Sequence, residues 1–416
     1  MDFLRAASLC AVVLGHWLMA APRVGDGGAS LDHLLSISPW THFLTWLFQV
    51  MPIFFFVGGW SNATTWSAAR RDGLPFSDWL HRRTVRLLLP VGVLLLFWLV
   101  AGAVAAAAGL DPEILRVASR IALVPVWFLA VYLVVVALVP LTHGAWQKWG
   151  MGSVWGLVAA ACFIDWGFFT QGWKALGWTN YLVLWAAVHQ LGYVWKEGRL
   201  ASTRLQALCA AGGLALLVWM VRVGPWPVSL VGVPGDPVSN TTPPHLPLLA
   251  LAGLQFGMVR LLEAPLSRWL SRPIPWTATL VLSSSLMTLF LWHSTSMILL
   301  IGAAFWAGGV GMHAEPASLA WWAGRLLWLP LLAAALAPFL AGFGRFERSK
   351  SVSAGPPSAT RQVLGLLVAC VGLAFLADGG VTGPGWLGLA WVPLGLALAG
   401  IFVAIRVGPP FFRPRR

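Results

Sequence analysis

Two polar side chains, Arg5 and His16, interrupt the apolar stretch MDFLRAASLCAVVLGHWLMAA at 1–21. An imidazole that titrates near neutral pH can take a proton from a hydroxyl, and a guanidinium can hold an anion. Their eleven-residue spacing closes to within about 20° of three helical turns. Both side chains are therefore expected on one face of a helix, about 16 Å apart along its axis. Ionisable residues inside a membrane span usually mark a functional site.

A plainer interpretation of the same pair stays open. Arg5 can snorkel to the cytoplasmic interface, and His16 can be a hydrogen-bonded polar residue of the core. The two residues alone do not distinguish a structural role from a catalytic role, so the rest of the sequence is needed.

The composition predicts an all-α fold, a polytopic bundle of membrane helices. The 416 residues are 58% hydrophobic and 10% charged, and repeated apolar runs of about 20 residues indicate membrane spans. We expect about twelve spans, at 3–21, 39–62, 86–107, 121–142, 150–168, 178–195, 205–224, 246–262, 277–302, 319–341, 362–378 and 387–405.

The net charge of +13 follows the loops rather than one surface. Of the 27 Lys and Arg residues, twenty fall in one set of alternate loops, four in the other set and three within spans. This is the asymmetry of the positive-inside rule, not a nucleic-acid footprint. We therefore expect a multi-pass protein of the cell membrane with both termini in the cytoplasm, and no nucleic-acid partner.

The four cysteines show no metal-binding spacing, so we expect reduced, structural thiols and no metal site. No motif for a bound cofactor occurs. A charged and then Ser/Gly/Pro-rich stretch at 348–361 predicts a cytoplasmic linker. It separates a ten-span body, 1–347, from a two-span appendage with a basic tail, 362–416.

Arg82, Arg83 and Arg86 open the third span on its cytoplasmic side. Arg82 and Arg86 are four residues apart and share a helix face. Guanidinium groups suit phosphate, which makes the cluster a candidate for donor binding. Ordinary positive-inside anchoring explains most such clusters.

Other polar or aromatic residues recur at similar depths in several spans. The outer half holds the candidates for binding an acceptor or an oxyanion: Trp127, Asn180, Asn240, Trp292 and His293. The inner half adds His189 and Gln190. Each could instead be a hydrogen-bonding residue between helices. Asp165 is expected at an outer interface.

Together these motifs resemble the integral-membrane acyltransferase type 3 family. The resemblance rests on Arg5-x10-His16, FFFVGG at 54–59, the arginine cluster ending at Pro90, PVWFL at 125–129 and TLFLWHS at 288–294. Their order and spacing make it specific over residues 1–347. Gly58 departs from it, because many members have Ser there.

The resemblance implies transfer of an acyl group, usually acetyl, from cytoplasmic acyl-CoA to a hydroxyl of an extracytoplasmic glycan, lipid or small molecule. It implies that Arg5 and His16 are the essential pair and that Arg82, Arg83 and Arg86 bind the donor. Acyl-CoA is then a co-substrate and the bilayer a partner. A transporter is the alternative, although no inverted repeat and no clearly buried midplane acid supports it. A purely structural membrane protein would leave Arg5 and His16 unexplained.

Overall fold

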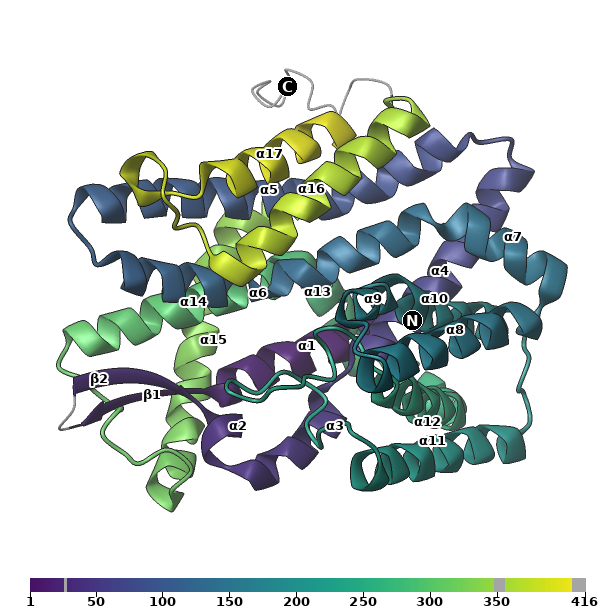
Figure 1. The fold of residues 1–416 in the computed structure, drawn as a ribbon, viewed down its shortest axis with the longest axis horizontal. Coiled ribbons are helices and arrows are strands. Elements are labelled where there is room, and N and C mark those ends of the chain that lie inside the picture. Colours follow the sequence, from purple (N-terminus) through teal and green to yellow (C-terminus); the bar gives the residue numbers. More distant parts are fainter. Residues whose placement is uncertain (26–27, 348–355, 406–416) are drawn as a thin grey trace. The chain divides into compact units, whose positions relative to one another are not determined.

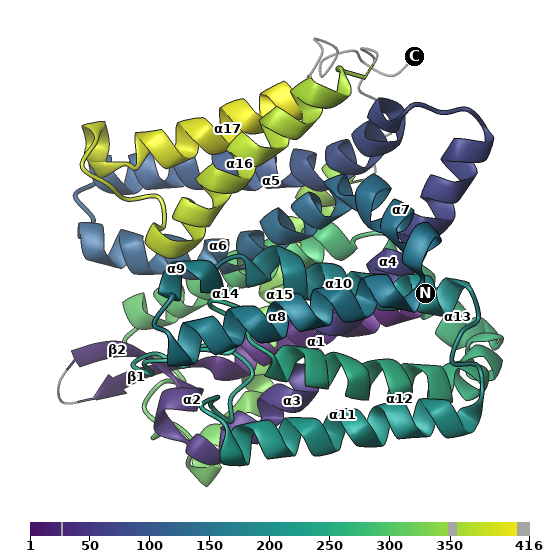
Figure 2. The ribbon, with the colours of Figure 1, turned by 45° about the vertical axis from the view of Figure 1, so that its right-hand side comes forward.

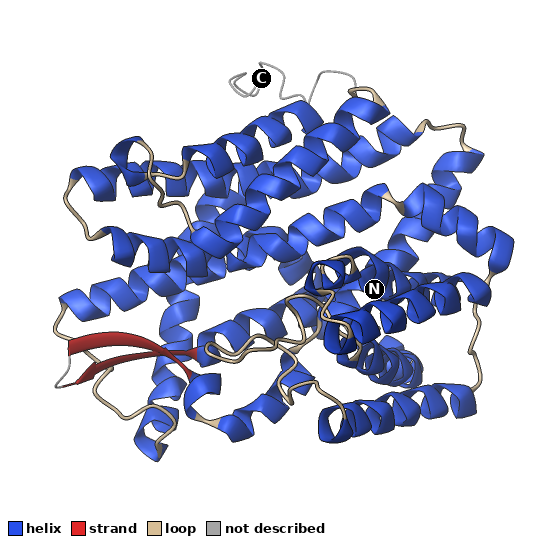
Figure 3. Cartoon of the chain, viewed as in Figure 1, coloured by secondary structure: helices blue, strands red, loops and turns tan. Residues whose placement is uncertain are grey.

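The computed structural model describes residues 1–25, 28–347 and 356–405. Helices make up most of this part of the chain, and the strands form one two-stranded sheet (Figure 3). Among the described segments, ten helices are long and apolar enough to cross a membrane. The predicted all-α polytopic bundle is confirmed. The remaining two expected spans are shorter helices, α10 with 17 residues and α17 with 15.

The chain divides into two compact units (Figure 1). Unit 1 comprises Met1–Ala68, Leu138–Ser283 and Met312–Ala323. Its elements are α1 (Asp2–Met19), β1 (Ala20–Gly25), β2 (Gly28–His33), α2 (Leu34–Ile37), the 3₁₀ helix η1 (Pro39–Leu44), α3 (Thr45–Phe48), α4 (Met51–Arg71), α7 (Val139–Trp149), α8 (Met151–Thr170), α9 (Lys174–Gly177), α10 (Asn180–Lys196), α11 (Thr203–Val223), α12 (Pro247–Leu270) and α13 (Pro273–Ser283).

Unit 2 comprises Ala69–Ala137, Ser284–Gly311 and Gly324–Arg416. Its elements are α5 (Phe76–Ala107), α6 (Pro112–Ala137), α14 (Leu286–Trp306), α15 (Leu319–Glu347), α16 (Ala359–Gly379), the 3₁₀ helix η2 (Trp386–Gly388) and α17 (Trp391–Ile405). The last three residues of α4 belong to this unit, and the first turn of α15 belongs to unit 1.

The first helix runs directly into a hairpin. α1 ends at Met19 and β1 begins at Ala20, with no connecting loop. β1 and β2 pair in antiparallel fashion, and the register places Ala20 opposite His33. The predicted span 3–21 therefore agrees with α1, and the hairpin fixes which residues lie at its C-terminal end.

Two glycines let α4 and α10 approach each other backbone to backbone. A Cβ on Gly59 would lie 1.8 Å from the carbonyl oxygen of His189. A Cβ on Gly192 would lie 2.2 Å from the carbonyl oxygen of Phe56. Small residues at crossings allow such close packing of membrane helices, so the expected close approach at the FFFVGG segment is confirmed at Gly59.

The expected single span at 277–302 is wrong. α13 ends at Ser283 and α14 begins at Leu286, and the backbone of Ser285 is non-helical at φ −140° and ψ 23°. Serine side chains compete for backbone hydrogen bonds and disfavour helix interiors, and three consecutive serines end the helix here.

The fourth span begins earlier than predicted and also ends earlier. α6 starts at Pro112, and the backbone N–H of Glu113 donates to Asp111 Oδ1 at 2.7 Å. An acidic residue just before a first-turn proline is a helix start signal. Pro140 lies in the first turn of α7, where its missing N–H is tolerated.

The last two helices pack within unit 2. α16 packs against α17 and α6, and α17 packs against α5 (Figure 2). The division into a body, a linker and an appendage stays a prediction, and residues 348–355 and 406–416 of that division lie outside the described residues.

Candidate active site

α1 carries Arg5 and His16 in one uninterrupted helix, so their spacing places both on one face. Arg5 Nη1 donates to Asp2 Oδ1 at 3.0 Å, and 30% of the Arg5 side chain is exposed. His16 is half-buried, between the buried residues Gly15 and Trp17. The pair thus combines a half-exposed cation at the start of α1 with an imidazole near its end.

α3 packs beside His16. A Cβ on Gly15 would lie 3.5 Å from Cδ1 of Phe48, so the two helices are in contact at that point. His16 lies one turn before Ala20, whose partner in the hairpin is His33. The neighbouring elements of unit 1 therefore hold the end of α1 that bears the histidine.

The three arginines of α5 do not form one cluster. Arg82 and Arg86 are exposed on one helix face. The guanidinium carbon of Arg83 lies 4.0 Å from the ring centroid of Trp79, and its Nη1 donates to the Trp79 carbonyl oxygen at 3.2 Å. Arg82 and Arg86 are thus available to an anion, whereas Arg83 packs on its own helix. α5 belongs to unit 2 and α1 to unit 1.

Asn180 and Asn240 are both fully buried in unit 1. Asn180 Nδ2 donates to Asp165 Oδ1 at 2.9 Å. Asn240 Nδ2 donates to the carbonyl oxygens of Pro227 and Ser229, each at 2.8 Å. Both amide groups hold parts of unit 1 together, which leaves only their Oδ1 atoms unpartnered among the described residues.

Asp165 is the centre of this cluster and is 1% exposed, near the end of α8. Its expected place at the outer interface stays a prediction. Besides Asn180, three groups donate to it: His245 Nδ1 at 2.8 Å, the Leu246 backbone N–H at 2.9 Å and Trp226 Nε1 at 3.1 Å. A buried carboxylate is stable only when its oxygens are hydrogen-bonded in this way. The four donors tie α8 to α10 and to the loop at 225–246.

Trp292 and His293 lie on α14 in unit 2 and are fully buried. The Trp292 ring stacks on Phe343 at 4.0 Å between centroids. His293 Nδ1 donates to the Phe290 carbonyl oxygen at 2.7 Å, and Ser294 Oγ lies 3.1 Å from Nε2. Both ring nitrogens of His293 thus have hydrogen-bond partners within α14.

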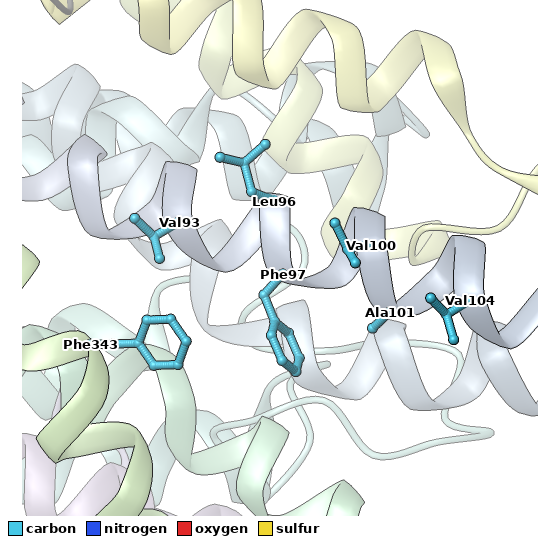
Figure 4. Close-up of a pocket in the computed structure, with 7 residues that line it drawn as sticks. All are labelled: Val93, Leu96, Phe97, Val100, Ala101, Val104 and Phe343. Carbon is cyan, nitrogen blue, oxygen red and sulfur yellow. The ribbon is translucent and has the colours of Figure 1, made fainter. Parts of the chain in front are cut away.

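Phe343 also lines an open, apolar groove of about 500 Å³ in unit 2. In Figure 4 its ring faces a row of α5 side chains. All of the lining residues are apolar: Val93, Leu96, Phe97, Val100, Ala101, Val104 and Phe343. The groove suits hydrocarbon and offers nothing to a phosphate.

Trp127 is half-buried near the middle of α6, with its ring centroid 6.5 Å from that of Phe128. Because α6 begins at Pro112, Trp127 stands about 22 Å along the helix. Its expected place in the outer half of the membrane stays a prediction.

The inner candidates lie in a hydrogen-bonded network of unit 1. Asn62 Nδ2 lies 3.1 Å from His189 Nε2. Ser153 Oγ donates to Gln190 Oε1 at 2.8 Å, and Gln190 Nε2 donates to the Thr142 carbonyl oxygen at 3.4 Å. These contacts join α4, α7, α8 and α10, as expected of polar residues that pack membrane helices.

The interpretation of the sequence missed the pair Asp165 and His245. The signal for Asp165 was present, since an ionisable residue inside an apolar span is a functional-site hypothesis by default. His245 lies eighty residues further along, in a loop rich in proline, and no spacing rule links the two. Within the described ranges, no group of three His, Cys, Asp or Glu side chains could hold a metal ion.

The model of an acyltransferase domain, that of the acyltransferase 3 family, matches residues 1–344. The chain therefore belongs to the acyltransferase 3 family, and the resemblance drawn from its motifs is confirmed. The match covers α1, α5 and the Asp165 cluster, and it ends before α16. No curated protein and no solved structure matches the chain. The protein is thus a multi-pass membrane acyltransferase.

Proposed function

We propose that the protein moves an acyl group, acetyl in the simplest case, from cytoplasmic acyl-CoA to a hydroxyl of an extracytoplasmic or membrane-associated acceptor. The observation that carries this proposal is the pairing of Arg5 and His16 on one face of α1, in a chain of this family. Of the two, only His16 can accept a proton at neutral pH. The proposal includes a location in the cell membrane with both termini in the cytoplasm, which the distribution of Lys and Arg among alternate loops supports.

The donor side of the proposal rests on Arg82 and Arg86. Both are exposed on the same face of α5, whereas Arg83 packs on Trp79. Exposed guanidinium groups four residues apart suit the phosphates of coenzyme A, because charge-assisted hydrogen bonds to phosphate are strong and directional. Acyl-CoA acts here as a co-substrate that leaves after the reaction.

His16 supplies the chemistry in either of two routes. As a general base, it takes the acceptor proton while the hydroxyl oxygen attacks the thioester carbonyl; the C–S bond breaks and the thiolate leaves, to be protonated to the thiol. As a nucleophile, it first takes the acyl group onto its ring and then passes it to the hydroxyl. Both routes yield the ester and coenzyme A.

The test uses purified protein in detergent and in proteoliposomes with radiolabelled acetyl-CoA. We expect thioester cleavage, with His16→Ala reducing the rate by about 10²–10⁴-fold, the usual worth of a general base. His42→Ala is the matched control, since His42 lies outside α1 and bonds the Leu35 carbonyl oxygen. Label trapped on the protein after acid quenching favours the nucleophile route. Wild-type turnover by folded His16→Ala would refute the assignment, and solute flux without thioester cleavage would favour the transporter.

A second variant tests the donor site. Arg82→Gln with Arg86→Gln should raise KM for acetyl-CoA by about tenfold or more, because each contact to phosphate contributes roughly 1.5–3 kcal/mol. KM for a dephosphorylated analogue should change less. Arg70→Gln with Arg71→Gln is the control, since both of these arginines are also exposed at a helix end. Equal weakening of both donors would identify Arg82 and Arg86 as membrane anchors.

A further inference from the structure

His245 has one ring nitrogen bonded and the other without a partner. The side chain is fully buried, and Nδ1 lies 2.8 Å from Asp165 Oδ1. Nε2 is buried and has no hydrogen-bond partner among the described residues. Leaving a buried polar atom unpaired destabilises a protein, and native structures contain few such atoms. A group that completes the bond at Nε2 would account for it.

The partner of His245 determines what the free nitrogen can do. Four donors converge on the two oxygens of Asp165, so the carboxylate acts only as an acceptor here. Nδ1 of His245 therefore carries a hydrogen, and in the tautomer that this bond selects the lone pair lies on Nε2. The carboxylate also stabilises the imidazolium that forms when Nε2 takes a proton. An acid that orients a histidine base in this way is the arrangement found in hydrolytic and acyl-transfer triads.

The surroundings shield this nitrogen from bulk solvent. The rings of Phe168 and Phe169 lie 4.7 and 4.9 Å from the His245 ring, centroid to centroid. The loop at 225–246 covers the cluster and is held by side chains of the neighbouring elements. Trp46 Nε1 donates to the Val228 carbonyl oxygen at 2.8 Å, and Tyr181 Oη donates to the Thr241 carbonyl oxygen at 3.0 Å.

From this arrangement we propose that Asp165 and His245 form a second site of the enzyme, which binds a hydroxyl of the acceptor and takes its proton at His245 Nε2. The inference rests on the proposed function. On the route in which His16 first carries the acyl group, the hydroxyl oxygen attacks the acyl carbonyl, its proton passes to Nε2, and the bond from the carbonyl to the His16 nitrogen breaks. The leaving group then takes up a proton, which restores the neutral ring. Asp165 is a positioning residue that holds the ring.

A site closed to water has a clear use in this reaction. A histidine base in contact with solvent would activate water as readily as an alcohol, and the acyl donor would be hydrolysed. Closure excludes this side reaction and strengthens the pairing of imidazolium and carboxylate. The loop at 225–246 is then the segment that admits the acceptor.

The decisive variant is His245→Asn. The Asn side-chain nitrogen stands where Nδ1 stands and can still donate to Asp165, but nothing replaces Nε2. The matched control is Trp226→Phe, which removes the 3.1 Å bond from Trp226 Nε1 to Asp165 Oδ2 and leaves His245 unchanged. If the cluster is purely structural, both variants should change the thermal stability and neither should change acyl transfer per folded molecule.

The measurement uses membrane vesicles from producing cells, which contain the natural acceptor, and radiolabelled acetyl-CoA as the probe. Label in the organic extract reports a lipid hydroxyl, and label in the aqueous extract reports a glycan or small molecule. We expect His245→Asn to reduce labelling of non-protein material by about 10²–10⁴-fold. Its thermal stability and its donor step, read as label on the protein or as coenzyme A release, should stay near wild type.

Trp226→Phe should show the reverse pattern, with a lower thermal midpoint and nearly normal transfer per folded molecule. Asp165→Asn should reduce kcat with little change in KM for acetyl-CoA. Unchanged acceptor labelling by folded His245→Asn would overturn the proposal and leave Nε2 with a buried water only. If the wild-type protein neither releases coenzyme A nor takes up label, the proposed function is refuted, and the second site with it.

Discussion

α10 contacts two polar clusters, and the two clusters use histidine differently. At its first residue, Asn180 and His245 both donate to Asp165. Near the middle of the helix, His189 is bonded to Asn62. Both histidines are fully buried, and each has one ring nitrogen without a partner among the described residues.

The difference lies in the group that remains on the second ring nitrogen once the first nitrogen has bonded its partner. An amide nitrogen can only donate, so Nε2 of His189 accepts from Asn62 and Nδ1 carries the unused hydrogen. A carboxylate can only accept, so His245 keeps an unused lone pair. Two equally buried imidazoles therefore present opposite groups: an N–H donor at the crossing of α4 with α10, and a base beside α8. Burial alone does not distinguish a packing histidine from a candidate base.

The largest effect should come from Asp165→Ala, which removes the shared acceptor of the His245 cluster. Four donors would lose their partner, and each buried unpaired group costs about 1–3 kcal/mol. Since a whole domain is stable by only about 5–15 kcal/mol, we expect little monodisperse protein on size exclusion. A thermal midpoint near that of the wild type would mean that the cluster is not needed for folding.

The close crossing of α4 and α10 near His189 should be disrupted by a steric clash. In Gly59→Ala the new Cβ would lie 1.8 Å from the His189 carbonyl oxygen, so α4 and α10 must separate. Overpacking typically costs about 1–3 kcal/mol, and backbone contacts this short should exceed that range. Gly156→Ala on α8 is the control, because its Cβ would meet nothing within 4 Å. Equal thermal midpoints for the two variants would contradict the close crossing.

A smaller effect is expected from Asn62→Ala, which tests whether His189 and His245 differ in function. Asn62→Ala leaves Nε2 of His189 without the amide donor and should lower the free energy of unfolding by about 1–3 kcal/mol. Acyl transfer per folded molecule should not change, in contrast to His245→Asn. If Asn62→Ala suppressed transfer in a stable protein, His189 would belong to the reaction and the contrast drawn here would fail.

The smallest expected effect uses a third histidine, His33, which lies outside the membrane helices and whose buried Nδ1 has no partner among the described residues. Burial, followed by the nearby His42, lowers the pKa of His33 from 6.5 to about 4. The unfolded chain therefore binds a proton at a higher pH than the folded chain does. The resulting stability is present above about pH 6.5 and is lost as the pH falls towards 4.

Between pH 7 and pH 5 this contribution should decline by about 1–2 kcal/mol. Thermal midpoints in detergent at the two values measure the decline, and His33→Gln should reduce the difference between them. An identical difference in wild type and variant would show that another group dominates the acid response.

The sequence predicted much of this fold, and the reasons for its failures are local. Apolar runs identified the spans because lipid requires every backbone group to be paired inside a helix. The ends of the spans were harder, because the start of α6 depends on Asp111 and Pro112, which lie among polar residues. The break before α14 depends on three serines within an otherwise apolar run.

The candidate site shows the same limit. Arg5 and His16 were predictable because a helix turns a spacing of eleven residues into a shared face. Asp165 and His245 meet through the folding of a loop back onto α8, and no local pattern encodes that contact. The carboxylate was visible in the sequence, but its burial and its four donors were not.

The hairpin that follows α1 makes the junction between Met19 and Ala20 sensitive to insertions. Because Met19 is followed at once by a strand residue, the orientation of α1 about its own axis is fixed by the hairpin. One residue inserted between Met19 and Ala20 would turn His16 by about 100° relative to that anchor, and it would turn Arg5 by the same angle. Arg5 and His16 would still share one face of α1, but that face would be turned away from its present neighbours. At this junction a change in residue number should matter more than most changes in residue type.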